Sequence, residues 1–172
     1  MYEKAKGQMR LSERILAALP GFRGYKEKEL RRESDKLIRN HLYLKLSKVK
    51  SDVRGIFQKL SDRRAMDVLN DMDRLVAKFD RVTEKVNHAS YGYSGFFNVV
   101  KIEEASLDRM IDFDTKLIDD VNKLVDEVSA FKNEIAEHKF DNAGFRIQSL
   151  TEALDAFEEA FDKREEVILG VS

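Results

Sequence analysis

Residues 117–135 read LIDDVNKLVDEVSAFKNEI, and the spacing of their apolar side chains decides the fold class. The apolar residues of one face follow at alternating steps of four and three: Leu117, Val121, Leu124, Val128, Phe131 and Ile135. An average step of 3.5 residues places them along one side of a helix, the spacing of coiled-coil packing. We therefore predict an amphipathic helix over about residues 98–138.

The chain after this helix repeats the same pattern. Residues 139–142 (KFDN) predict a turn, and Asp141 or Asn142 is suited to cap a helix that follows it. That helix is expected to run to about Gly170 with this apolar seam: Ile147, Leu150, Leu154, Phe157, Phe161 and Ile168.

Before residue 98, a helical period extends from Lys26 to Ala89 with steps of three or four almost throughout. The stretch predicts either one helix of about 64 residues, roughly 95 Å long, or two helices divided at Ser51–Gly55. Since the apolar phase is kept across Gly55, we favour one very long helix, with Gly55 as the place for a kink.

Two loops separate the remaining elements. The only proline and two glycines fall within residues 20–24 and end a short helix over 3–19, while residues 88–98 are rich in glycine and aromatic residues. No segment alternates with a period of two. The sequence therefore predicts an all-α fold, an elongated three- to four-helix bundle with coiled-coil-like packing and a single domain over residues 1–172.

Composition narrows the chemistry available to the chain. The sequence holds no cysteine, which excludes disulfides, thiolate catalysis and cysteine-ligated zinc or iron–sulfur sites. Its longest strictly aliphatic run, residues 15–19, is far shorter than a membrane span, and the N-terminus reads as no signal peptide. We expect a cytoplasmic protein.

The net charge of −1 conceals a strong asymmetry. Residues 1–64 contain 18 lysines and arginines against 8 acidic residues, a balance of +10, and residues 65–172 have a balance of −11. The basic stretch from Arg23 to Lys50 has two interpretations: a helix face that is solvated or docked on the acidic helices, or a surface for an anionic partner.

The histidines and the sequence motifs predict no catalytic, cofactor or metal site. A di-iron bundle needs Glu-x-x-His, but Ile38, Lys85 and Ile135 stand three residues before the three histidines. His88 and His138 should lie at opposite ends of the bundle, while His41 and His138 are able to approach if the long helix is unbroken. Nucleophile-elbow and nucleotide-binding glycine motifs are missing from the sequence.

Loop aromatics and the basic start of the long helix form the candidate binding surface. The aromatic residues either cap the ends of the bundle or are exposed to grip a partner. The candidate residues are Phe22, Arg23, Tyr25, Lys26, Lys28, Arg31, Arg32, Tyr91 and Tyr93.

Part of this surface carries a resemblance. Residues 19–36, LPGFRGYKEKELRRESDK, are similar to a segment of uncharacterised prokaryotic helical proteins. The resemblance implies that the loop and the basic start of the following helix form one unit, and it implies no activity or site residues.

The function predicted from the sequence is that of a non-enzymatic helical scaffold or adaptor acting through protein–protein interaction. Self-association as an antiparallel dimer is expected, since parts of the chain differ in charge. One alternative is peripheral binding of an anionic membrane or nucleic acid through the basic N-terminal half. A second alternative is an enzyme with an unrecognised site.

Overall fold

Four α-helices make up the part of the chain that is described. The computed structural model of the protein describes residues 28–89 and 104–169, and the side chains of residues 36–89, 112–164 and 166. The helices are α2 (Lys28–Asp62), α3 (Met66–His88), α4 (Glu104–Ala136) and α5 (Ala143–Leu169). These residues contain no strand, so the predicted all-α bundle is confirmed.

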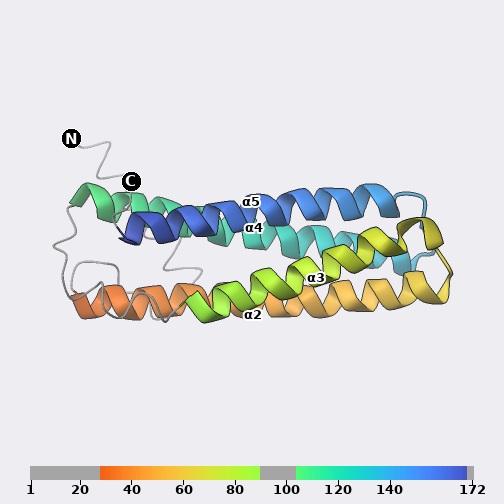
Figure 1. Ribbon diagram of the computed structural model, residues 1–172, viewed down its shortest axis with the longest axis horizontal. Helices are drawn as coiled ribbons and strands as arrows, with labels where there is room; N and C mark the ends of the chain where they lie inside the picture. The colour runs from red at the N-terminus through yellow and green to blue at the C-terminus, as the bar shows by residue number, and fades with distance from the viewer. Residues whose placement is uncertain (1–27, 90–103, 170–172) are drawn as a thin grey trace.

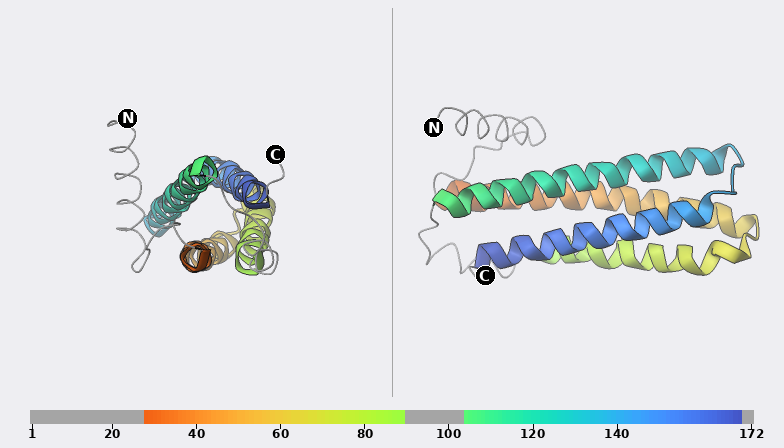
Figure 2. Two further views of the ribbon diagram at one scale, coloured as in Figure 1. Left: turned by 90° about the vertical axis from the view of Figure 1, so that its left-hand side faces the viewer. Right: turned by 90° about the horizontal axis from the view of Figure 1, so that it is seen from above.

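The bundle consists of two helical hairpins laid side by side in the same direction (Figures 1 and 2). Helices α2 and α3 form one antiparallel hairpin, and α4 and α5 form the other. Helix α2 lies beside α4 and runs parallel to it, as shown by contacts of Lys45 with Asn122 and of Asp52 with Lys132. Both hairpin turns, residues 63–65 and 137–142, therefore lie at one end of the bundle, here called the turn end.

The expectation of one very long helix is wrong. Helix α2 does continue through Gly55, as favoured, but it ends at Asp62, and α3 begins at Met66. The apolar stripe steps by five residues from Leu60 to Ala65 instead of three or four. A chain that reverses here packs the apolar stripes of α2 and α3 into one core, whereas an unbroken helix would leave much of its stripe exposed.

The two turns end their helices in the same way. Arg64 N donates to Ser61 O (2.9 Å) and Ala65 N donates to Leu60 O (3.1 Å). In the second turn, His138 N donates to Ile135 O and Lys139 N to Glu134 O, at 3.2 and 2.9 Å. This pair of bonds is the Schellman motif, which satisfies the last carbonyls of a helix by placing one residue in the left-handed region.

The core lies along the centre of the bundle and uses the residues that the periodicity predicted. The seams of α4 and α5 are buried from Leu117 to Ile135 and from Ile147 to Phe161, and α2 is buried from Ile38 to Leu60. In α3, Leu75 is buried and Val76 is half-buried.

A constant offset relates the two hairpins. Eleven of the twelve buried apolar residues of the first hairpin have a buried apolar residue 75 positions later, and the exception, Ile38, corresponds to half-buried Phe113. The pairs include Leu42 with Leu117 and Val86 with Phe161. The bundle is thus an internal repeat in its pattern of burial, although only a few residues are identical at that offset.

Ion pairs join the hairpins along α3 and α5. Arg81 donates to Glu158, with one N–O distance of 2.8 Å, and Lys85 lies 2.7 Å from Asp162 and 3.2 Å from Glu158. On α2, Arg54 bonds Asp80 of α3 at 2.8 Å. Three acidic residues of α5, Asp155, Glu158 and Asp162, are therefore neutralised by cations of α3.

Candidate binding surface at the turn end

Most of the predicted binding surface lies outside the described residues. Residues 22–26, Tyr91 and Tyr93 fall there, while Lys28, Arg31 and Arg32 lie in the first turns of α2, where only the backbone is described. That surface stays a prediction. The described residues instead show a candidate site at the turn end.

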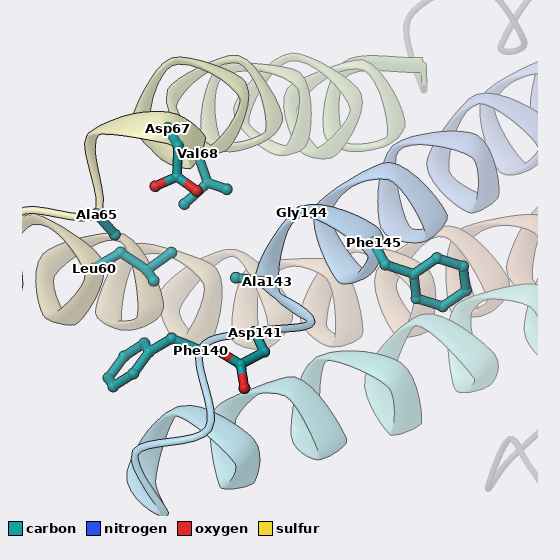
Figure 3. A pocket seen from close by; sticks show the side chains of 9 residues that line it. All are labelled: Leu60, Ala65, Asp67, Val68, Phe140, Asp141, Ala143, Gly144 and Phe145. Carbon is teal, nitrogen blue, oxygen red and sulfur yellow. The ribbon is translucent and has the colours of Figure 1, made fainter.

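A cavity of about 460 Å³ opens between the first turns of α3 and α5 (Figure 3). The volume falls within the range of pockets that bind small ligands or single large side chains. Helix α2 supplies Leu60 at its end, and each turn and each following helix supplies the rest: Ala65, Asp67, Val68, Phe140, Asp141, Ala143, Gly144 and Phe145. Seven of the nine lining residues are apolar or glycine, although polar atoms make up more of the exposed lining than apolar atoms do, and the cavity depends on the two turns lying together.

Exposed apolar side chains gather beside this cavity. Among the described side chains, three large hydrophobic residues are strongly exposed: Leu44 on α2, Met66 at 73% and Phe145 at 71%. Phe145 lines the cavity, and Met66 stands between two lining residues in the sequence. An exposed apolar surface next to a concavity is a feature of interaction sites.

The charged residues that line the cavity are both acidic. Asp67 lies in the first turn of α3, where the helix dipole favours a negative charge, and Asp141 lies in the α4–α5 turn. Figure 3 places them on different walls of the cavity. Both residues are exposed, and no described cation forms an ion pair with either carboxylate.

The cations around the cavity are largely engaged. The guanidinium of Arg63 lies 5.1 Å from the centre of the Phe140 ring and 2.7 Å from His138 Nδ1, so it ties the first turn to the second. Because a guanidinium only donates, Nδ1 is the acceptor and His138 carries its proton on Nε2 in this contact. Lys139 pairs with Glu137 at 2.6 Å, while Arg64 is exposed.

An ion pair between α5 and α4 holds α5 in place at the turn end. Arg146 Nε donates to Glu134 Oε2 at 3.1 Å, and the guanidinium lowers the pKa of the Glu134 carboxyl by hydrogen bonding and by its charge. Gly144, one of the lining residues, brings α5 close to α3: a Cβ built there would lie 3.7 Å from Val68 Cγ1.

The histidines do not meet. His138 lies at the turn end and His88 at the end of α3, as expected. His41 precedes the end of α2 by about 30 Å of helix, so the approach to His138 that an unbroken helix would have allowed does not occur. Burial, and to a lesser degree the charge of Lys45, lowers the pKa of His41. Within the described residues, no three or more histidine, aspartate or glutamate side chains are grouped to hold a metal ion.

A smaller cavity, about 280 Å³, lies between α2 and α3 far from the turns. It is lined by two cations of the predicted basic stretch, Lys36 and Arg39, with Asn40, Tyr43, Val86 and Asn87. Further along α2, Lys45 donates to Asn122 and Lys50 lies 3.3 Å from Asp80. Part of the basic stretch is thus engaged within the bundle.

Sequence reasoning missed the turn-end site because it treated residues 63–66 as helix interior. A signal was present: Met66 and Phe145 fall outside the apolar stripes of α3 and α5, which continue with Leu69 and Ile147. An apolar residue off the buried stripe of an amphipathic helix must face solvent or a partner.

No helix in the described ranges is long and apolar enough to span a membrane. Comparisons of the chain with protein families, curated proteins and solved structures gave no match.

Proposed function

We propose that the protein is a non-enzymatic helical scaffold or adaptor that binds another protein through the turn end of its bundle. One observation carries this proposal: of the three strongly exposed large hydrophobic residues among the described side chains, Phe145 lines the turn-end cavity and Met66 stands in the sequence between two residues that line it. Apolar residues in such a place cost solubility unless a partner covers them. The predicted cytoplasmic location is part of the same proposal.

The rigidity of the turn end supports this role. The Arg63–His138 contact joins the turns, and Arg146 bonds Glu134 across α4 and α5. A surface held in place before binding loses less conformational entropy when a partner docks.

Photo-crosslinking tests the proposal. A benzophenone amino acid is placed at Phe145, at Met66 or, as a control, at Gln148, which is exposed one turn further along α5. In living cells, irradiation is expected to yield the same adduct from positions 145 and 66 and not from 148. Adducts that are equal at all three positions, or absent from all three, would contradict the proposal. An adduct of twice the chain mass would identify a second copy, as in the predicted self-association.

The smaller cavity favours one other function, binding of an anionic membrane or nucleic acid through the basic N-terminal half. Lys36 and Arg39 both line it, and both belong to the predicted basic stretch. Electrostatic binding of this kind weakens steeply with salt. Co-sedimentation with anionic vesicles and gel shifts with DNA at low and high salt test it, and a lack of binding at low salt would reject it.

A further inference from the structure

We propose that the turn-end site binds a basic amphipathic helix of a partner protein, with an apolar side chain in the cavity and lysine or arginine side chains on Asp67 and Asp141. This inference rests on the proposed function and adds the chemistry of the partner.

The apolar part of the site has the size of an anchor pocket. A cavity of about 460 Å³, whose lining includes Leu60, Val68 and Ala143, accepts one or two large side chains, not a whole helix. Phe145 and Met66 extend the apolar surface beyond the cavity. A partner helix in such a setting inserts anchor residues and lays the rest of its apolar face on the exposed side chains.

The charge of the site determines which side chains the polar face of the partner helix must carry. Asp67 and Asp141 are the charged residues of the lining, and neither has an ion-pair partner among the described residues. Docking an apolar face beside them removes water from both carboxylates, which is costly unless cations replace it. An acidic segment would add repulsion to this desolvation cost.

The chain's own cations near the cavity do not neutralise Asp67 and Asp141. Arg63 is held by Phe140 and His138, and Lys139 is paired with Glu137. Arg64, the residue after Arg63, is exposed, and among the described residues it forms no ion pair with Asp67 or Asp141. Elsewhere in the bundle the chain neutralises its own acids, as Arg81 and Lys85 do for Glu158.

The same carboxylates argue against a membrane as the occupant. Exposed Phe145 and Met66 would suit an interfacial contact. Asp67 and Asp141, which line the cavity, would however meet the negative surface potential of anionic lipids. A protein segment carrying its own cations satisfies both parts of the surface.

Two synthetic amphipathic peptides test the inference on the full-length chain. Both carry leucine at the same helical positions, and their polar faces carry either lysine or glutamate. Binding is measured by fluorescence anisotropy and located by amide chemical shifts of the protein. The lysine peptide is expected to bind and to shift amides of residues 65–68 and 140–145, and the glutamate peptide to bind at least tenfold more weakly.

Paired variants make the test specific. Asp67→Asn with Asp141→Asn is expected to weaken the lysine peptide about tenfold. Asp126→Asn with Glu152→Gln removes the same charge from exposed positions on α4 and α5 and should leave affinity unchanged. Equal losses in both double variants, or shifts located elsewhere, would overturn the inference. Thermal unfolding of each variant confirms that it is folded.

A third variant separates this inference from the proposed function. Phe145→Ser should abolish binding of the lysine peptide at the turn end. If both peptides bind there, depend on Phe145 and ignore the aspartates, the basic partner is wrong and the docking surface stands. If Phe145→Ser changes nothing, and position 145 gives no specific adduct in cells, both proposals fail.

Discussion

Arg64 and His138 occupy the same place in the two turns, each as the left-handed residue that ends a helix, with φ of 56° and 62°. Glycine is the usual residue there, because a side chain in this conformation costs about 1–2 kcal/mol. Here an arginine and a histidine occupy these positions instead. Arg63, next to Arg64, contacts both His138 and Phe140 and so connects the two turns.

Arg64→Gly is expected to stabilise the protein by about 1 kcal/mol, since it relieves the left-handed strain without removing an ion pair. The free energy of unfolding in urea measures the effect. Arg63→Gly serves as the control, because Arg63 does not have a positive φ and contacts His138 and Phe140. It should destabilise the protein. Loss of stability in Arg64→Gly would show that its side chain has an unrecognised structural role.

Gly55→Ala should also raise stability, by about 1 kcal/mol. Gly55 lies in the interior of α2, is exposed, and has no atom within 4 Å of the position of an added Cβ. The gain would appear as a higher midpoint of thermal unfolding. A decrease would mean that α2 must bend at Gly55, as the sequence allowed.

The buried ion pair of Asp114 and Arg164 joins α4 to α5, with side chains 0% and 1% exposed. Burial raises the pKa of the Asp114 carboxyl, and the guanidinium opposes this effect. Asp114→Ala is expected to cost about 3–5 kcal/mol of unfolding free energy, because it leaves a buried guanidinium without its carboxylate. The double variant Asp114→Leu with Arg164→Met should recover most of the loss. Additive losses in the double variant would contradict this account.

Acid should weaken the contact between the hairpins. Hydrogen bonds from Arg81, and secondarily from Lys85, hold the pKa of the Glu158 carboxyl below its usual range against the opposing effect of burial. A carboxyl with a lowered folded-state pKa stabilises the protein above its unfolded pKa of about 4.3, and this stability is lost as pH falls through the folded pKa.

Glu158→Gln removes this contribution at neutral pH. Wild type and variant should differ in unfolding free energy near pH 7, and the difference should shrink as pH falls below about 5. Glu159→Gln, which removes a charge from an exposed helical pair with Lys163, is the matched control and should have a smaller effect. A difference independent of pH would assign the role of Glu158 to packing.

The helices could be predicted from the sequence because periodicity is a local property, and seams such as Leu117–Ile135 are buried as expected. The break after Asp62 was missed because neither glycine nor proline marks it: Arg64 adopts the conformation that glycine usually provides. Only the five-residue step from Leu60 to Ala65 indicated it.

The internal repeat and the candidate site depend on contacts that periodicity does not describe. The repeat keeps apolar character rather than identity, as in Phe79 with Leu154 and Val82 with Phe157. The site forms where two turns 75 residues apart in sequence come together, and no local pattern around Phe145 or Asp67 contains that information.

Both turns lie at one end of the bundle, so the chain leaves the described helices only at the other: before Lys28, between Ala89 and Glu104, and after Leu169. Helix α2 alone is about 52 Å long. Phe145 and Met66 therefore lie about the length of α2 away from the three places where the chain leaves the described helices, so a protein docked at the turn end would be held well apart from those places.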